Sequence, residues 1–131
     1  RGVLRGLHMQ RGSSAQAKLV RVLEGSVLDI AVDLRKGSPS FGQHFAIELT
    51  ADNHKQFFVP AGFAHGFVVL SESAIFSYKV DNWYAPEYEA GIHWNDNKLN
   101  IHWEIDQKEV VVSERDSKLP KFSEFQSPFT K

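Results

Sequence analysis

Residues 18–34 read Lys18-Leu19-Val20-Arg21-Val22-Leu23-Glu24, then Gly25-Ser26, then Val27-Leu28-Asp29-Ile30-Ala31-Val32-Asp33-Leu34. Apolar and charged side chains alternate through the first run, which is the period of a half-buried β-strand. Branched residues dominate the second run, with Asp29 and Asp33 set among them. The Gly-Ser step between the runs is typical of a tight turn. The stretch therefore predicts two strands, 18–24 and 27–34, joined as a hairpin.

Similar patterns continue on the C-terminal side of this stretch. Further strands are predicted at residues 43–50, 55–59, 67–70 and 74–80, with turn residues between them. No stretch before residue 85 repeats its apolar residues at the helical period, and beyond it we expect loops and short helical turns. Many short strands at regular spacing indicate an all-β fold, a β-sandwich or small barrel. We expect a single domain spanning residues 1–131.

Composition narrows the classes of function. The chain has 131 residues, of which 42% are hydrophobic, enough for one sizeable core. A net charge of −1 supplies no basic field for nucleic acid or for an anionic membrane surface. The lack of cysteine excludes thiolate chemistry, and no apolar run reaches the roughly 18 residues of a membrane helix. We expect a cytoplasmic protein. Because the chain opens at Arg1 inside motif-like sequence, we also expect it to lack an N-terminal segment.

The segment ahead of the first predicted strand carries the residues best suited to chemistry. Arg5 and His8 lie close together in Arg5-Gly6-Leu7-His8-Met9-Gln10, and Lys18 follows shortly after. A base beside fixed positive charges is suited to removing a proton next to a carbonyl in an anionic substrate. Because Lys18 and Arg21 are three positions apart, a regular strand places them on opposite faces. If Lys18 points inward, it can stabilise an enolate oxygen.

A lone histidine is more often structural than catalytic, so the interpretation of His8 depends on a partner. A carboxylate behind the ring would fix its tautomer and orientation. Three aspartates are candidates for this position: Asp29, Asp33 and Asp116.

Other candidate residues follow the middle strands. In Val59-Pro60-Ala61-Gly62-Phe63-Ala64-His65-Gly66-Phe67, a Pro-Gly turn is expected to place His65 at the mouth of the next strand. His65 either has a functional role there or only forms a hydrogen bond to the turn. Tyr78 closes an apolar run and is either a core residue or an acid facing a histidine across a pocket. Trp83 and Tyr84 are expected at the surface, where they either pack or stack on a planar ring.

Several motifs combine with those above: Ala17-Lys18-Leu19-Val20-Arg21-Val22, Asp29-x-Ala31-Val32-Asp33-Leu34-Arg35, Ser38-Pro39-x-Phe41-Gly42, Tyr78-Lys79, Tyr84-Ala85-Pro86-Glu87 and Ser113-Glu114-x-Asp116. Together they resemble the dTDP-4-dehydrorhamnose 3,5-epimerase family, from the first residue to about Pro120. The resemblance implies a cupin-type jelly roll, a β-sandwich or barrel with short C-terminal helical or loop segments. It also implies a homodimer, and further residues ahead of Arg1 that supply part of the nucleotide site.

The resemblance implies an isomerase that needs no metal and no other cofactor. Its substrate would be dTDP-4-dehydro-6-deoxy-D-glucose, a dTDP-4-keto-6-deoxyhexose, epimerised at C3 and C5 to dTDP-4-dehydro-L-rhamnose. By similarity His8 is the base, Asp116 orients it, and Tyr78 is the acid on the opposite face. Lys18 would hold the C4 oxygen of the enolate, and Tyr84 would stack on the thymine ring. Further residues match positions that bind substrate: Arg5, Gln10, His65, Glu89 and Arg115.

Three alternatives remain open at this point. A metal-dependent cupin needs clustered ligands, commonly two histidines one residue apart, and the sequence has no His-x-His. A 3-epimerase or 5-epimerase would invert one centre with the same base, acid and lysine. A catalytically inactive sugar-nucleotide-binding cupin would keep the fold without chemistry, although it has no need for His8, Lys18, Tyr78 and Asp116 together.

Overall fold

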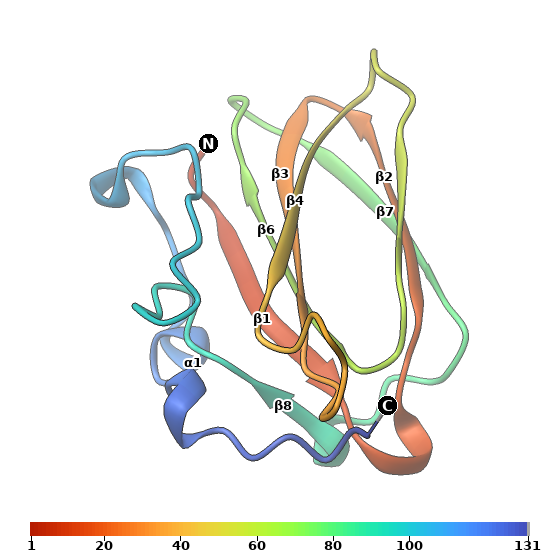
Figure 1. Ribbon diagram of the computed structural model, residues 1–131. Coiled ribbons are helices and arrows are strands. Elements are labelled where there is room, and N and C mark those ends of the chain that lie inside the picture. The colour runs from red at the N-terminus through yellow and green to blue at the C-terminus, as the bar shows by residue number, and fades with distance from the viewer. Residues whose placement is uncertain (131) are drawn as a thin grey trace.

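The predicted strands at residues 18–24 and 27–34 are both present, as β2 (Lys18–Glu24) and β3 (Ser26–Asp33). The structure, a computed structural model, describes residues 1–130, and these form eight strands with short helical turns (Figure 1). Within this range no helix is long and apolar enough to cross a membrane. The other strands are β1 (Leu4–Gln10), β4 (His44–Thr50), β5 (Gln56–Val59), β6 (Phe63–Val69), β7 (Ile75–Val80) and β8 (Glu89–Gly91). The helical turns are Gly12–Ser14, Pro86–Tyr88, Gln107–Glu109, α1 (Glu114–Ser117) and Phe122–Glu124.

The strands form two antiparallel sheets that face each other, which confirms the all-β sandwich. One sheet has the strand order β4-β3-β6-β1-β8 and the other β5-β2-β7. The predicted hairpin is wrong, because β2 and β3 belong to different sheets. Gly25 carries the chain across with a φ of +79°, and a Cβ there would lie 2.2 Å from the carbonyl oxygen of Ser73. The turn therefore changes sheets instead of pairing its flanking strands.

The other predicted strands agree with the structure to different degrees. Those at 43–50, 55–59 and 74–80 are confirmed within one residue at their starts. The strand predicted at 67–70 begins four residues earlier, at Phe63, because β6 pairs with β3 from Asp33 onward. His65 therefore lies inside the strand and not at its mouth. Strands β1 and β8 were not predicted, and the three residues of β8 are too few to show an alternating pattern.

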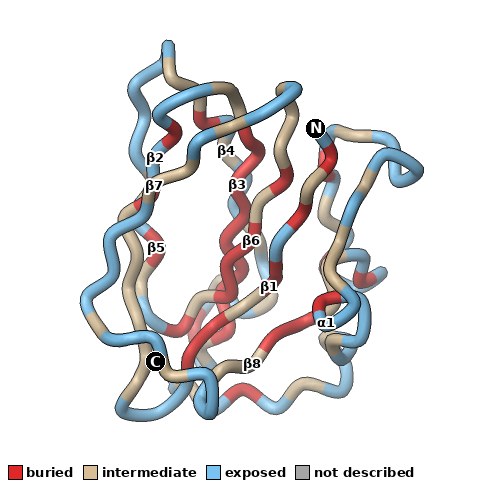
Figure 2. Tube along the Cα trace, turned by 180° about the vertical axis from the view of Figure 1, so that it is seen from behind, coloured by how far each residue is buried: buried red, intermediate tan, exposed pale blue. Residues whose placement is uncertain are grey.

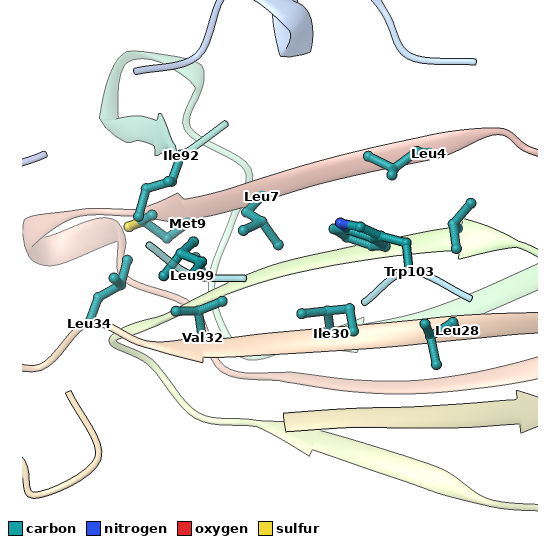
Figure 3. Packing of buried hydrophobic residues seen from close by; sticks show 12 residues of the cluster. Leu4, Leu7, Met9, Leu28, Ile30, Val32, Leu34, Ile92, Leu99 and Trp103 are labelled. Atoms are coloured by element: carbon teal, nitrogen blue, oxygen red, sulfur yellow. The ribbon is translucent and has the colours of Figure 1, made fainter. Parts of the chain in front are cut away.

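Strand β3 is the centre of the larger hydrophobic core. Leu28, Ile30 and Val32 project from one face of β3 toward Leu7 of β1 and Trp103 of the C-terminal segment (Figure 3). Figure 2 shows buried residues concentrated on β3, β6 and β1. Each fully buried aliphatic side chain contributes roughly 1.5–3 kcal/mol. The segment after residue 91 has the loops and short turns that were predicted, and its residues Ile92, Leu99 and Trp103 pack against the five-stranded sheet in the larger core.

A second, smaller core lies between the two sheets. It consists of Val20 and Val22 from β2, Val27 from β3 and Leu49 from β4, with partly buried aromatic residues around it. Because side chains alternate along β3, Asp29 shares this inter-sheet face with Val27, whereas Leu28 faces the larger core. The inter-sheet space is therefore apolar at one end and receives polar side chains farther along.

An irregularity in β1 brings its polar side chains to one face. Arg5 lies opposite Phe67 of β6, and His8 lies opposite His65, so three steps on β1 match two steps on β6. Arg5 and His8 would point to opposite faces of a regular strand, but this bulge turns both to the inter-sheet side. Gly6 occupies the bulge with a φ of +124°, and a Cβ there would meet the Cα of Gly66 at 2.7 Å.

Asp33 organises the turn between β3 and β4. Its carboxylate is fully buried and accepts bonds from the backbone and guanidinium of Arg35, at 2.9 Å, and from the hydroxyls of Ser38 and Ser40, at 2.6 Å. Burial by itself would raise the pKa of Asp33, but the bonds from Arg35, Ser38 and Ser40 outweigh it and hold that pKa well below its ordinary value. The ionised form is therefore part of the folded structure.

Asp33→Asn is expected to lower the free energy of unfolding by about 2–4 kcal/mol at pH 7, because it leaves several buried donors without a charged acceptor. The pKa of Asp33 is lowered by folding, so its contribution is present at neutral pH and is lost as the pH falls below about 4. The difference in free energy of unfolding between wild type and variant, measured by urea unfolding, should become smaller over that acid range. Asp52→Asn, at an exposed position, is the matched control. A difference that stays constant down to pH 2 would contradict this account.

Candidate active site

A cavity of about 450 Å³ opens between the two sheets, and most of the predicted site residues line it. β1 and β6 form one wall, β2 and β7 form the facing wall, and the segment around residues 84–89 closes one side. The predicted residues along it are Arg5, His8, Gln10, Lys18, His65, Tyr78, Tyr84 and Glu89. Asp116 and Arg115 do not line it, but they are hydrogen-bonded to His8 and Glu89, which do.

His8 is paired with Asp116, one of the three aspartates considered as its partner. The Nε2 atom of His8 lies 2.6 Å from Oδ1 of Asp116, whose side chain is only 2% exposed. The Ser113 hydroxyl accepts a bond from the backbone N–H of Asp116, and Gly6 N–H donates to Oδ2 at 3.1 Å. The carboxylate is therefore fixed from two sides. A carboxylate on Nε2 favours the tautomer with Nδ1 free to accept a proton.

The second cavity histidine has its own carboxylate. Nε2 of His65 lies 2.9 and 3.0 Å from the two oxygens of Asp29, and both side chains are buried. Asp29 is therefore the partner of His65 and not of His8, and Asp33 belongs to the turn described above. Sequence reasoning missed the pair of Asp29 and His65. The inward-facing position of Asp29 could be read from the alternation along β3, but the register of β6 against β3 could not.

Lys18 points into the cavity and Arg21 lies exposed on the outer face of the same strand, as their spacing predicted. Burial lowers the pKa of the Lys18 ammonium, while the carboxylates of Asp29 and Glu89 oppose this shift. Burial likewise raises the pKa of Asp29, against the opposing effects of His65 and Lys18. Lys18 is therefore a weakly hydrated cation held near two acids, able to bind an oxygen that becomes negatively charged.

Tyr78 lies on the sheet opposite His8. It is 62% exposed and lines the cavity, so it is not the core residue that one interpretation of the sequence allowed. It stands on β7 opposite Val20 of β2, two positions from Lys18, and both Lys18 and Tyr78 face the cavity. A ligand lying between the sheets would thus meet the histidine on one face and the phenol on the other.

Apolar rings that were not singled out from the sequence form the floor of the cavity. Phe67 of β6 stacks on Phe76 of β7 with ring centroids 4.5 Å apart, and His65 stacks on Phe76 at 6.3 Å. Both phenylalanines line the cavity; the opposite face of β6 packs into the larger core, whereas the opposite face of β7 is largely solvent-exposed. Period-two alternation along β7 was the signal that could have identified Phe76.

Glu89 joins three of the predicted residues at the side of the cavity. Its Oε2 accepts a bond from the Tyr84 hydroxyl at 3.0 Å, and its Oε1 accepts one from the Arg115 guanidinium. Oε1 also lies 3.8 Å from Nδ1 of His8. Arg5, on the β1 wall of the cavity, is exposed and donates one guanidinium N–H to the carbonyl of Leu4. The remaining guanidinium donors of Arg5 and Arg115 are available to an anion.

Gln10 lies at the cavity wall, but its side-chain amide already forms hydrogen bonds to other groups of the protein. Nε2 donates to the carbonyl oxygens of Ser14 and Trp83, at 2.7 and 3.0 Å, and Oε1 accepts from the N–H of Ala85 at 2.9 Å. Both donors of the side chain are thereby used. Among residues 1–130, the histidines, aspartates and glutamates form no group of three that could hold a metal ion.

Comparison with known proteins gives one family. The family model described as dTDP-4-dehydrorhamnose 3,5-epimerase matches residues 1–124. A relative of that name from Pseudomonas aeruginosa is 56% identical over 116 residues, which are 88% of this chain and 63% of the relative. The relative from Salmonella typhimurium is 54% identical over 107 residues, 82% of this chain and 58% of the relative. The chain thus spans about six-tenths of the length of these curated relatives.

Solved structures share the fold. The dTDP-4-dehydrorhamnose 3,5-epimerase from Elizabethkingia anophelis superposes with a TM-score of 0.92 at 56% identity, over 93% of this chain and 67% of that one. A 3,5-epimerase from Legionella pneumophila, in complex with dTDP-4-keto-L-rhamnose, gives 0.91 at 46% identity, over 96% and 66%. A 3'-monoepimerase from Streptomyces bikiniensis, in complex with dTDP-quinovose, gives 0.88 at 33% identity, over 94% and 62%. These similarities confirm the cupin-type jelly roll.

Proposed function

The chain belongs to the dTDP-4-dehydrorhamnose 3,5-epimerase family, and we propose that it epimerises dTDP-4-dehydro-6-deoxy-D-glucose at C3 and C5 to dTDP-4-dehydro-L-rhamnose. The observation that carries this proposal is the pairing of His8 with buried Asp116 on one wall of the cavity, opposite Tyr78 on the other. Inversion needs a base on one face of the sugar and a proton donor on the other. His8 and Tyr78 stand on opposite sheets and both line the cavity, which supports this assignment.

The chemistry follows from the ketone at C4. The carbonyl acidifies the C–H bonds at C3 and C5, and His8 takes one of these protons on Nδ1. The electron pair moves into an enolate whose oxygen is held by the Lys18 ammonium. Tyr78 then returns a proton to the same carbon from the other face, which inverts the centre. A positioned acid or base typically contributes 10²- to 10⁴-fold in rate, and one fixed donor to an oxyanion contributes about 10²- to 10³-fold.

The nucleotide half of the substrate is assigned to the side of the cavity around Glu89. Tyr84 is 65% exposed there and has its hydroxyl tied to Glu89, which leaves the ring faces free to stack on thymine. Arg5 and Arg115 provide cations for the diphosphate. His65, held by Asp29, faces the sugar from the same wall as His8.

The test is NMR of dTDP-4-keto-6-deoxyglucose incubated with the protein in D₂O. Deuterium at both C3 and C5 supports double epimerisation. Deuterium at one carbon alone would replace the proposal with a single-centre epimerase, an activity that the 3'-monoepimerase from Streptomyces bikiniensis is named for on a similar fold. Binding without exchange at either carbon would indicate a catalytically inactive sugar-nucleotide-binding protein.

Tyr78→Phe is expected to slow product formation about tenfold or more while C–H bond breaking continues, because only the proton donor is lost. Water reaches this exposed position and partly replaces the phenol as the proton donor in the variant. The measurement compares label loss from a C3- or C5-deuterated substrate with the appearance of inverted product. Tyr88→Phe, at an exposed position that does not line the cavity, is the control. Equal rates for Tyr78→Phe and wild type would reject the role of acid.

We also propose that the protein is a homodimer, as the resemblance to the family implied. The outer face of the β5-β2-β7 sheet exposes Leu23, Phe58 and Ile75, and β4 and β5 are open sheet edges. Light scattering should give twice the chain mass for the wild type and a monomer for Phe58→Glu. Glu48→Gln, exposed on the other sheet, serves as the control. A wild-type monomer at micromolar concentration would overturn this proposal.

A further inference from the structure

Gln10 is buried, with 6% of its surface exposed, and stands two residues after His8 on the cavity side of β1. Its three hydrogen bonds all go to backbone groups, in two segments that meet at the mouth of the cavity. One segment is the turn after β1 and the other follows β7. The side chain therefore joins two loops from distant parts of the sequence.

Two of these bonds lie on either side of Tyr84. Gln10 donates to the carbonyl of Trp83, the residue before it, and accepts from the N–H of Ala85, the residue after it. At the other end of the tyrosine, the hydroxyl is bonded to Glu89. The backbone of Tyr84 and the tip of its ring are thus both fixed in the protein without ligand.

Packing contributes little to the position of this segment. Trp83 is 89% exposed and Tyr84 is 65% exposed, so apolar burial does not hold either ring in place. Hydrogen bonds hold the segment instead, and most of them come from amide side chains, with Asp81 bonding Ala17 as well. Gln16 donates to the carbonyl of Asn82 at 2.7 Å, and Asn82 donates to the carbonyls of Ser13 and Ala15. Gln10, Gln16 and Asn82 form a cluster, the amide cluster, between the two loops.

We propose that Gln10 is a positioning residue, which holds Tyr84 in the orientation that receives the planar base of a nucleotide. This rests on the proposed function and replaces a direct contact of Gln10 with substrate. An aromatic ring that is already ordered loses less conformational freedom when the ligand binds, so the affinity is higher. Gln10 does not touch the reacting carbons, and its effect is expected mainly in KM.

The experiment compares Gln10→Ala with wild type in three measurements. The Kd for dTDP, from calorimetry, and the KM for the nucleotide sugar should each rise about tenfold, while kcat changes less than about threefold. Hydrogen exchange of the Ala85 amide should be at least about tenfold faster in the variant without ligand, because its acceptor is gone. Amides in the β3–β6 pairing report on the rest of the fold and should be unchanged.

The matched control is Asn53→Ala. The amide of Asn53 also bonds only backbone groups, at Glu48, Thr50 and Lys55, in a turn that does not line the cavity. This variant should bind dTDP as wild type does. If Gln10→Ala does not fold, Asn82→Ala removes another link of the amide cluster from a half-buried position and should shift Kd in the same direction.

Two results would overturn the inference. One is an Ala85 amide that exchanges equally fast in Gln10→Ala and wild type. The other is faster exchange with an unchanged Kd for dTDP, since the segment would then be held without consequence for binding. A wild-type chain that binds no dTDP contradicts the proposed function instead. The two failures are told apart because the Ala85 amide reports on Gln10 without any nucleotide.

Discussion

His8→Ala is expected to lower deuterium incorporation at both C3 and C5 by at least about 10³-fold, which removes measurable epimerisation. Under the proposed mechanism both centres depend on His8, whose Nε2 is held by Asp116 at 2.6 Å and whose ring lines the cavity. Nearby Glu89 does not replace it, since its carboxylate is committed to Tyr84 and Arg115. The loss should appear in kcat, with dTDP affinity within about threefold of wild type.

Two further variants sharpen this result. Asp116→Asn keeps the shape of the partner but loses its charge and favours the wrong tautomer of His8. It should therefore lower kcat by a factor close to the one expected for His8→Ala. His102→Ala, at an exposed histidine that does not line the cavity, should leave the rate unchanged. Exchange in His8→Ala within tenfold of wild type would exclude His8 as the base.

Lys18→Ala is expected to lower kcat by about 10² or more, the scale of losing one donor to an oxyanion. The pH profile provides a second, independent check. Because burial lowers the pKa of Lys18, the ammonium is lost at a pH below the ordinary lysine value of about 10.4. Activity of the wild type should therefore fall as the pH rises through that lowered pKa, and the alkaline fall should be absent in Lys18→Ala.

Lys98→Ala, an exposed lysine in a loop outside the cavity, is the matched control and should retain both the rate and the alkaline fall. Removing a buried cation beside Asp29 also changes the free energy of unfolding. Measuring unfolding of Lys18→Ala at pH 7 therefore distinguishes a loss of catalysis from a loss of stability. A folded Lys18→Ala protein with wild-type kcat would exclude enolate stabilisation by this side chain.

The sequence predicted strands more reliably than their partners. Period-two alternation located β2 and β3, but nothing in it distinguished a hairpin from a turn that changes sheets. The difference lies in burial: β2 is exposed to solvent on its outer face, whereas β3 is covered on both faces and is an interior strand of the larger sheet. Small residues such as Ala64 and Gly66 masked the start of β6, because their strand propensity is low.

The sequence indicated which residues gather at the cavity better than it indicated how they pair. Asp29, Asp33 and Asp116 were equal candidates beside His8 by local reasoning, and only the resemblance favoured Asp116. The structure separates them by long-range placement: α1 brings Asp116 to β1, β3 brings Asp29 to His65, and Arg35 holds Asp33 in a turn. The commitment of Gln10 to backbone groups depends equally on two loops meeting in space.

The small core between the sheets holds the proposed acid and the proposed base apart. His8 stands on one sheet and Tyr78 on the other, so the distance across the cavity depends on how closely the sheets approach each other. Val20, Val22, Val27 and Leu49 fill that gap at its apolar end. A bulkier side chain there is expected to push the sheets apart, whereas a smaller one leaves a cavity into which the sheets relax only in part. The spacing of the two proposed groups therefore depends in part on residues that do not line the cavity.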